Sequence, residues 1–592
     1  MEEPKSTGIY IENVAVAHDQ GIHHVGLHAH EIHHDLVAAE AVGGHVNDLP
    51  KGYYWSPSFI GTFVATCLAQ ISGYLGWVLP ANTISLVIAS LGPSPNAIWL
   101  GVSWTTGAAV GFALVGRLSD IFGRRWFFTS VTVMALIGNI IGASAQSVNM
   151  LIATNAINGL AAAGQLSFFV VISELVPDKN RGPWNAVVLT TSLPFAVFGP
   201  PVARALYENT ALQWRWAYIL GIIVNGIATI LYLIFYHPPT YEQLHVGGKT
   251  KMQQLKSLDW LGIFLFTTGL TVFLIGLNWG GSVHPWKSGH VLGALLAGIV
   301  TLTLFCVWEA YCNLDYPLIP MTLFKSREYN CLVACASIGC MIYYAGGIIW
   351  PTMAGALFTT DITDVGWLSC AVGGGLLLGQ IMGGFGVRFI PKMKWQMTIA
   401  SVFMVAFVAA LASSTEYTRT RTVAFLILGT VSAGYIENIT LSTFGLIWDP
   451  EDIGLSAGAA GAIRTASGAI AASMYSSILN TEMAKHLPRY VSPAAAEAGL
   501  PEASLPALFS GITAGSFAGV PGITDEVVVS VGHAVKTAYS MAFRTVFLCT
   551  LPFGAIILVA AVLSPNVEKY LTDGVARKLQ GAGKKDEKAG EV

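Results

Sequence analysis

The chain has 592 residues, of which 53% are hydrophobic and only 11% are charged, and its formal net charge is −3. Soluble domains carry roughly 25% charged residues, so the composition excludes an ordinary water-soluble protein. A charge this close to balance also argues against a nucleic acid as a partner.

The apolar residues fall into fourteen long blocks, separated by short stretches that hold glycine, proline and charges. Each block can cross the ~30 Å hydrocarbon core of a bilayer as a helix, and none alternates as a membrane strand would. Because every backbone N–H and C=O in hydrocarbon needs an internal partner, the sequence predicts an all-α polytopic membrane protein. The predicted spans are 59–87, 98–114, 126–143, 150–171, 186–203, 216–235, 260–277, 291–310, 332–357, 367–385, 395–411, 423–447, 455–479 and 546–563.

The loops between the predicted spans differ in their basic residues. One set includes Arg117, Arg124, Arg125, Lys179 and Arg181, and the other set carries far fewer. Loops rich in Lys and Arg stay in the cytoplasm. An even number of spans places both termini on one side, so we expect both to be cytoplasmic.

Long polar or mixed stretches divide the chain. The segment 480–545 is rich in Ala, Pro and Gly, and we expect it to be partly helical over the membrane surface. The predicted units are a disordered, His-rich cytoplasmic tail (1–55), an N-terminal six-helix bundle (56–236), a cytoplasmic loop (237–259), two inserted spans (260–310), a C-terminal six-helix bundle with the external segment 480–545 (311–563), and a cytoplasmic tail (564–592).

One pattern in the first tail resembles a metal site. His30-Glu31-Ile32-His33-His34 matches the H-E-x-x-H signature of zinc proteases, but that chemistry needs both histidines on a helix of a folded catalytic domain. A polar tail provides no such core. No span holds a catalytic cluster of His, Asp or Ser either, so we predict no metal, no cofactor and no enzyme activity.

The strongest local signal lies between the second and third predicted spans, where the chain reads Gly116-Arg-Leu-Ser-Asp120-Ile-Phe-Gly123-Arg124-Arg125. Glycines permit close backbone approach, the arginines hold the cytoplasmic face, and Asp120 can bind the N-terminus of a neighbouring helix. This turn resembles the corresponding loop of the major facilitator superfamily. The resemblance implies two related six-helix bundles, with Gly116, Asp120, Gly123 and Arg124 forming a cytoplasmic gate.

A second stretch, Gly384-Phe-Gly-Val-Arg388-Phe-Ile-Pro391-Lys392, closes the tenth span with similar spacing of glycine, turn breaker and basic residue. Such a repeat is typical of transporters whose substrate site lies between two related halves near the midplane.

Further motifs narrow the resemblance to the fourteen-span drug:proton antiporter branch. Gly199-Pro200 in the fifth span stands at the Gly-Pro core of the antiporter motif. The stretches that look most similar to the fungal trichothecene efflux pump family are Gly164-Gln-Leu-Ser-Phe168, Glu174-Leu-Val-Pro177, Trp214-Arg-Trp216, His237-Pro-Pro-Thr-Tyr241 and Gly276-Leu-Asn-Trp-Gly280.

The chain departs from the branch at one functional position. The fourth-span motif usually carries an arginine tied to proton coupling, and here Leu151, Asn155, Asn158 and Gly159 occupy the pattern. Either other residues couple the proton or the mechanism differs.

Glu437, near the middle of the twelfth span, is our first candidate for the proton carrier. A charge at this depth costs about 2.5–3.5 kcal/mol or more, and burial disfavours the charged form of a carboxyl. Arg464 in the thirteenth span could be its partner or bind a substrate oxygen. A static structural ion pair is the alternative. Arg204, at the outer end of the fifth span, is explained by extension of its side chain to the interface.

Several polar and aromatic residues occur at depths where a central cavity would lie, and such residues suit an apolar, oxygenated, uncharged ligand. For each of them, helix packing is the competing interpretation. They are Gln70, Asn155, Asn158, Gln165, Tyr343, Tyr344, Trp350 and Gln380.

The resemblance therefore implies a proton-driven exporter of small organic molecules such as fungal secondary metabolites, trichothecene-like toxins or fungicides. The expected partners are the small-molecule substrate, protons and the bilayer of the plasma membrane, with the protein a monomer. Two alternatives stay open: a proton-coupled importer of siderophore-type chelates, and a membrane receptor that binds a ligand without moving it.

Overall fold

The computed structural model describes residues 42–580, except for 93, 95, 98, 241–249, 282, 313, 315, 449–451 and 515–519. The described chain is almost entirely helical, with one antiparallel pair of short strands, β1 (Val42–His45) and β2 (Gly574–Arg577). The pattern at 30–34 lies outside the described residues.

The N-terminal bundle is built from the first helices of the chain. They are α2 (Pro57–Leu91), α3 (Trp99–Phe122), α4 (Arg124–Ala143), α5 (Val148–Gln165), α6 (Phe168–Leu175), α7 (Arg181–Thr191), α8 (Leu193–Ala196), α9 (Gly199–Asn209) and α10 (Trp216–Phe235).

The remaining helices form the inserted pair, the C-terminal bundle and its extension. They are α12 (Lys251–Lys256), α13 (Trp260–Trp279), α14 (Gly289–Tyr311), α15 (Arg327–Leu357), α16 (Ile362–Phe389), α17 (Met393–Ala410), α18 (Arg419–Thr443), α19 (Ile453–Glu497), α20 (Leu505–Ala514), α21 (Asp525–Leu548) and α22 (Leu551–Leu563).

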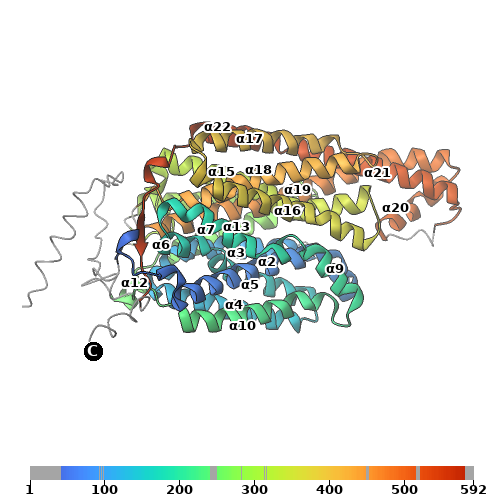
Figure 1. The fold of residues 1–592 in the computed structure, drawn as a ribbon. Helices are drawn as coiled ribbons and strands as arrows, with labels where there is room; N and C mark the ends of the chain where they lie inside the picture. The colour runs from blue at the N-terminus through green and yellow to red at the C-terminus, as the bar shows by residue number, and fades with distance from the viewer. Residues whose placement is uncertain are drawn as a thin grey trace, which may run out of the picture.

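The two bundles lie side by side with parallel long axes (Figure 1). They meet where α3 contacts α19, α7 contacts α16, and α2 contacts α15. The inserted helices α13 and α14 pack on each other, and α13 also touches α3 and α19, so the pair lies beside the junction of the bundles.

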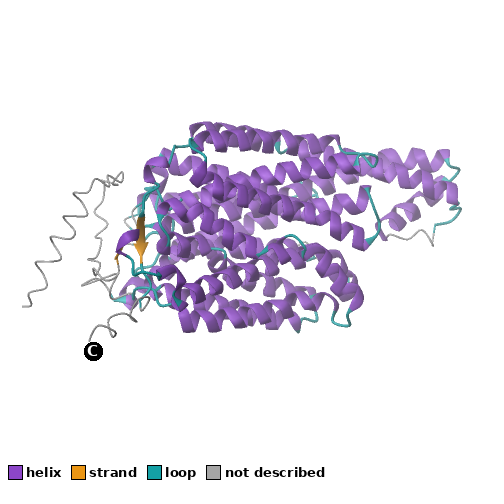
Figure 2. Ribbon diagram, in the orientation of Figure 1, coloured by secondary structure: helices purple, strands orange, loops and turns teal. Residues whose placement is uncertain are grey.

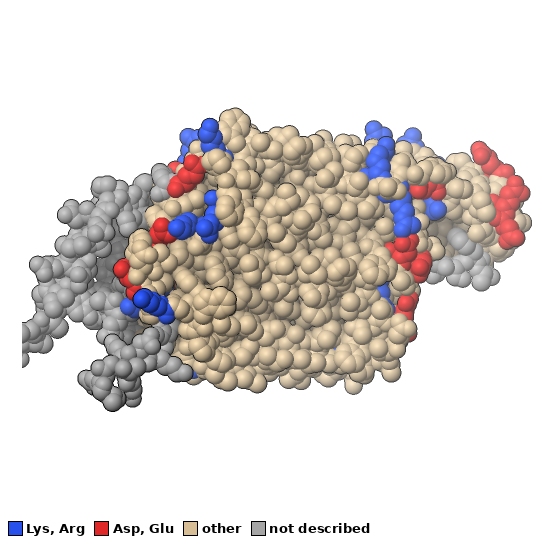
Figure 3. Space-filling model, in the orientation of Figure 1, with Lys and Arg blue, Asp and Glu red and all other residues tan. Residues whose placement is uncertain are grey.

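The two ends of the molecule differ. The strands β1 and β2 lie at the end opposite α20 (Figure 2). We call these ends the termini end, where β1 and β2 lie, and the α20 end. On the face drawn in Figure 3, charged residues gather in two rims, and a broad band between the rims has none. Apolar side chains such as Phe264 and Leu296 are more than half exposed, as lipid contact requires.

Twelve helical segments of the described chain are long and apolar enough to cross a membrane, and each matches a predicted span. The other two predicted spans, 186–203 and 455–479, are also helical. The first is interrupted, and the second is rich in small residues and contains Arg464. The count of fourteen therefore stays a prediction.

Three predicted spans are not continuous helices, and the last of them, 546–563, breaks at Cys549 and Thr550 between α21 and α22. The fourth breaks at Leu166 and Ser167, between α5 and α6, and the fifth is divided among α7, α8 and α9. Pro194 and Pro200 stand in the first turns of α8 and α9, where a missing backbone N–H is tolerated. The prolines thus mark the breaks of the fifth span, whereas the break at Leu166 has no proline beside it and α2 continues through Pro80.

The segment 480–545 is partly helical, as the sequence predicts. Helix α19 continues to Glu497, α21 already begins at Asp525, and both extend past the rest of the bundle together with α20 (Figure 1). This extension has its own small core, which includes Val491, Leu508 and Val527. The helices continue outward because they bury apolar faces against each other.

The two tails are also more ordered than the sequence suggests. Residues 42–55 contain β1 and a short 3-10 helix, Tyr53–Trp55, and β1 pairs with β2 from the other end of the chain. Val567, Tyr570 and Leu579 belong to the main apolar core. The part of each tail next to the membrane region is therefore folded, because it buries apolar side chains.

Candidate transport site

A narrow cavity of about 30 Å³ lies between the two bundles. The N-terminal bundle supplies side chains from α2, α3, α6 and α7, and the C-terminal bundle supplies side chains from α15, α18 and α19. Its lining consists of Gly73, Tyr74, Trp77, Trp104, Leu166, Phe168, Leu189, Cys340, Tyr343, Tyr344, Glu437, Leu441 and Arg464. We call this the central cavity.

The two charged groups of the central cavity form an ion pair. Arg464 Nη1 donates to Glu437 Oε1 at 2.8 Å, and the Gln380 amide donates to Glu437 Oε2 at 2.9 Å. The Arg464 guanidinium also lies 5.5 Å from the ring centre of Phe112 on α3. Each carboxylate oxygen therefore has one donor and keeps a lone pair that can accept another hydrogen bond.

Aromatic rings form a large part of the wall. Trp77 lies 5.5 Å from Trp104 and 5.4 Å from Tyr344, measured between ring centres, and Tyr343 lies 5.2 Å from Tyr344. The Trp104 indole N–H is buried and has no hydrogen-bond partner among the described residues. An apolar ligand with oxygen acceptors suits this combination of flat apolar faces and unused donors.

The predicted asparagine and glutamine residues of α5 lie elsewhere. Asn155 donates to the Leu100 carbonyl and accepts from the Tyr218 hydroxyl. Asn158 donates to Asn139 at 3.4 Å. All of these contacts join helices inside the N-terminal bundle, so Asn155 and Asn158 line neither cavity described here.

Three other predicted residues also do not line the central cavity. Gln165 donates to Asn225 at 2.7 Å within the N-terminal bundle, and Trp350 donates to the Leu368 carbonyl at 2.8 Å. Gln70 is fully buried in α2. Of the predicted site residues, the structure therefore brings together Tyr343, Tyr344, Glu437, Arg464 and Gln380. Gln70, Gln165 and Trp350 lie apart from this group.

A second narrow cavity of about 20 Å³ lies closer to the α20 end. It shares Trp77 and Tyr343 with the central cavity. The rest of its lining comes from α2, α8, α9, α15 and α16 and includes Asn82 and Pro351. Pro200, from the predicted antiporter motif, is part of its wall. Gly199 packs on α2, where a Cβ would lie 2.9 Å from Val78.

Arg204 joins the two bundles beyond this second cavity. Its side chain donates to the Asn82 carbonyl on α2 and to the Ile362 carbonyl on α16, both at 3.3 Å, and the residue is 8% exposed. The expectation that Arg204 extends to the interface is therefore corrected. Backbone carbonyls of two helices accept hydrogen bonds from its Nη1 and Nη2 inside the protein.

At the termini end, two glycines bring the bundles into backbone contact. A Cβ on Gly116 would lie 2.8 Å from the Gly454 carbonyl oxygen, and a Cβ on Gly384 would lie 2.5 Å from the Gly182 carbonyl oxygen. These are the first glycines of the two repeated stretches. Each glycine lies near the end of a span in one bundle and contacts the start of a helix in the other bundle. The sequence repeat therefore corresponds to equivalent contacts in the two halves.

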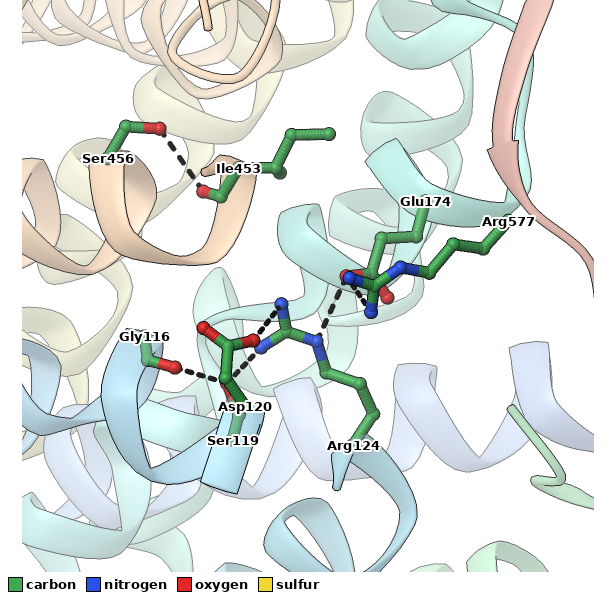
Figure 4. Close-up of polar contacts among 8 residues, drawn as sticks. All are labelled: Gly116, Ser119, Asp120, Arg124, Glu174, Ile453, Ser456 and Arg577. Atoms are coloured by element: carbon green, nitrogen blue, oxygen red, sulfur yellow. Dashed lines mark hydrogen bonds and ion pairs between the residues drawn. The ribbon is translucent and has the colours of Figure 1, made fainter. Parts of the chain in front are cut away.

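A buried charge cluster lies beside the first of these contacts (Figure 4). Arg124 bonds to Asp120 at 2.8 Å through Nη2 and to Glu174 at 2.9 Å through Nε, and it also donates to the Ser119 hydroxyl. Arg577 from β2 bonds to the same Glu174 oxygen at 3.1 Å. Two cations thus balance two carboxylates.

The turn that presents Arg124 depends on a glycine. Gly123 has φ of +84° and immediately precedes α4, and a side chain there would be strained. Asp120 was expected to bind the N-terminus of a neighbouring helix, but its bond in this structure is to Arg124. It is Arg124 that reaches the start of α19, where a Cβ on Gly454 would lie 2.6 Å from Nη2.

Sequence reasoning missed Glu174, Arg577, Trp77 and Trp104. Glu174 has a signal, because it is the one charge in the apolar run of α6. Tyr74 and Trp77 are three residues apart, which places them on one face of a helix. Arg577 has no comparable signal, since it follows the last span in a mixed polar tail.

Two bundles around a buried, charged and aromatic cavity, with direct contacts between the bundles on both sides of it, define a secondary transporter of the major facilitator type. The solved structure of the proton:xylose symporter XylE bound to 6-bromo-6-deoxy-D-glucose is similar to this chain with a TM-score of 0.51. The match covers 87% of this chain and 95% of that one at 14% identity, and it shows the fold.

The model of the fungal trichothecene efflux pump family matches residues 16–591, and the chain belongs to this family. The trichothecene efflux pump TRI12 of Trichoderma arundinaceum is 30% identical over 93% of both chains. The pump of the same name from Fusarium sporotrichioides is 27% identical over 92% of both. The MFS-type transporter prx5 of Penicillium rubens is 27% identical over 90% of this chain and 96% of its own. These relatives are transporters, and the family is one of efflux pumps.

Proposed function

We propose that this protein is a proton-driven exporter of small, apolar, oxygen-bearing molecules, such as fungal secondary metabolites of the trichothecene kind or fungicides of similar character. The observation that carries the proposal is the Glu437–Arg464 pair in the wall of a cavity otherwise built from aromatic and apolar side chains. The names of the relatives support the cargo class. We further propose that the protein works as a monomer in the plasma membrane, crosses it fourteen times, and has its termini end in the cytoplasm.

Glu437 is placed to serve the proton and the cargo in turn. When ionised, its carboxylate is held by Arg464 and Gln380 and can still accept a hydrogen bond from a cargo hydroxyl. A proton on the carboxylate turns one charged acceptor oxygen into an O–H donor, weakens the other oxygen as an acceptor, and weakens the pair with Arg464. Proton and cargo therefore compete for one group, which is the requirement for exchange in opposite directions.

Competition drives export only if the cavity opens to one side at a time. The glycine contacts and the charge cluster close the termini end, and Arg204 bridges the bundles toward the α20 end. Release of one set of contacts while the other holds gives alternating access. One charge moved across 100 mV is worth about 2.3 kcal/mol, enough for roughly a fortyfold concentration ratio.

In this proposal, Glu437 takes over the proton coupling that the fourth-span arginine provides in the antiporter branch. At that position Asn155 is occupied by bonds inside its own bundle. The pair on α18 and α19 thus provides a buried ionisable group in the C-terminal bundle in place of one in α5.

The test is accumulation of labelled sesquiterpenoid toxins and azole fungicides in cells with and without the protein, each with and without a protonophore. We expect lower accumulation in cells that express the protein, and loss of the difference when the protonophore is added. Export that persists in the protonophore contradicts the proton drive. No difference for any compound of the panel contradicts the cargo class.

A further inference from the structure

The segment after the last helix crosses the termini end from one bundle to the other. We call residues 567–580 the C-terminal strap. On the C-terminal bundle, the backbone N–H of Lys392 donates to Glu568 in the strap. Just before the strap, Asn566 accepts from the backbone N–H of Lys394 at 3.2 Å. The start of the strap is thus attached to the turn between α16 and α17.

A few residues later the strap is attached to the N-terminal bundle. The Thr572 hydroxyl donates to Asp178 at 2.6 Å, and the backbone N–H of Lys179 donates to the Thr572 carbonyl at 3.1 Å. The Lys179 ammonium pairs with Asp573. Asp178 and Lys179 lie between α6 and α7, so this attachment adjoins the charge cluster of Glu174.

The end of the strap is held by backbone bonds and by burial. The N–H of Leu579 donates to the Tyr53 hydroxyl at 3.1 Å, and the N–H of Gln580 donates to the His237 carbonyl at 2.9 Å. Val575 and Leu579 are at most 4% exposed. Burying two aliphatic side chains stabilises this position by about 1.5–3 kcal/mol each before the cost of ordering the segment.

Arg577 gives the strap a place in the charge cluster. It adds a second cation beside the Asp120 and Glu174 carboxylates, which both pair with Arg124. Arg577 bonds to the same Glu174 oxygen as Arg124 (Figure 4). Removing one member of a buried pair is strongly unfavourable because the remaining charge keeps its desolvation cost.

We propose that the C-terminal strap keeps the termini end closed, and that Arg577 is a positioning residue that acts through Glu174 on Arg124. The strap must loosen for the cavity to open at this end. This proposal goes beyond the proposed function, because it requires neither a particular cargo nor a proton drive; it rests on that function only for the cytoplasmic side of the termini end.

The length of the strap makes it a restraint. Only residues 569–571 separate its attachment on the C-terminal bundle from its attachment on the N-terminal bundle, and part of this stretch is a 3-10 helix, Glu568–Tyr570. A 3-10 helix rises about 2.0 Å per residue and an extended chain about 3.4 Å. Unwinding three residues therefore gives roughly 4 Å of slack. A larger separation of the bundles has to break the bonds at Thr572, Asp573 and Arg577.

Cys340 is a native reporter of this opening. It lies in the wall of the central cavity and is 6% exposed, so a membrane-impermeant methanethiosulfonate reagent reaches it when the cavity opens. The full-length protein is labelled in inside-out vesicles, and peptide mass spectrometry separates Cys340 from the other cysteines. We expect Arg577→Gln to raise the rate of Cys340 labelling about three- to tenfold. In right-side-out vesicles the same variant should lower the rate of Cys340 labelling, because a molecule that is open at the termini end is closed at the α20 end.

Lys578→Gln is the matched control, because it removes the neighbouring cation, for which the described residues show no ion pair. Arg577→Lys should give an intermediate rate. In a Glu174→Gln background, Arg577→Gln should add no further increase, since the two residues act through one contact. Lys179→Gln tests the strap at its exposed pair with Asp573, with the buried charges intact, and should also raise labelling.

Equal rates in Arg577→Gln, Lys179→Gln and the unmodified protein would overturn the proposal, and so would an equal increase in Lys578→Gln. If Arg577→Gln does not fold, as judged by gel filtration, Lys179→Gln and Arg577→Lys decide the question. The labelling needs no cargo and no gradient. Its failure is therefore distinguishable from failure of the proposed export.

Discussion

Arg464 on α19 and Glu437 on α18 lie 2.8 Å apart at the cavity between the bundles, with side chains that are 7% and 17% exposed. Gln380 on α16 holds the second oxygen of the same carboxylate. Three helices of the C-terminal bundle thus meet at one charge pair. Any change in its protonation alters contacts among all three.

Replacing Glu437 with Gln should uncouple export from the proton gradient. The carboxamide is uncharged at every pH, so it resembles the protonated carboxyl and cannot release a proton. We expect the steady-state cargo ratio across vesicle membranes to fall to about one, while exchange of internal for external cargo continues. Glu482→Gln, at an ion pair in the α20-end extension, is the control and should keep uphill transport. Normal uphill transport by Glu437→Gln removes this residue from the mechanism.

Replacing Arg464 with Met should destabilise the protein as well as stop transport. The substitution keeps much of the side-chain volume but leaves the Glu437 carboxylate without its cation. Breaking a buried pair from one side costs about 3–5 kcal/mol. We expect a lower unfolding midpoint for the purified variant and recovery of the midpoint in the double variant Arg464→Met, Glu437→Gln. A double variant as unstable as the single one contradicts a role of the ion pair in stability.

Replacing Gly116 with Ala should impair closure of the termini end. The added Cβ would meet the Gly454 carbonyl oxygen at 2.8 Å and Leu455 Cα at the same distance, and both are backbone atoms that cannot rotate away. We expect export to fall at least about tenfold. Gly226→Ala is the control, because a Cβ there meets nothing within 4 Å, and Ala favours a helix over Gly by about 1 kcal/mol. It should keep transport, and equal transport by both variants would show that the contact at Gly116 is dispensable.

The α20 end carries a pH-dependent contact at Glu416, in the loop between α17 and α18. Burial alone would raise the pKa of Glu416, but hydrogen bonds from His533, Tyr417 and Lys536 outweigh it and lower the pKa. A carboxyl with a lowered folded pKa contributes stability above its unfolded pKa of about 4.3, and this contribution disappears as pH falls through the folded value.

We therefore expect the unfolding midpoint of the purified protein to fall between about pH 5 and pH 3 by more than it does in Glu416→Gln. The contact is partly exposed, so the difference should be small and should decrease with salt. Parallel pH curves for the two proteins would show that the bonds to Glu416 do not stabilise the fold.

The sequence predicts the membrane spans and the central charge pair for the same physical reason. A bilayer requires long apolar helices, and charges such as Glu437 and Arg464 are costly there unless they find each other. The predicted repeat at Gly116 and Gly384 corresponds to equivalent contacts because close backbone approach demands glycine in both halves.

Other parts depend on partners that are remote in sequence. Nothing around Arg577 indicates that it meets Glu174, and an amide at Asn155 has the same sequence signal whether it lines a cavity or joins two helices. The breaks in the fifth span follow from its prolines, yet their effect on packing depends on α16. Neighbouring residues determine whether a segment is helical, whereas residues far apart in the sequence determine which helices contact each other.

Helix α19 connects the charge pair to the outer extension. From Arg464 to Lys485 it is helical without interruption, a rise of about 32 Å at 1.5 Å per residue. A tilt of about 10° at Arg464 would displace Lys485 by roughly 5 Å. A dye on this exposed lysine would therefore report the state of the buried pair by optical means, from outside the bilayer and without entering the cavity.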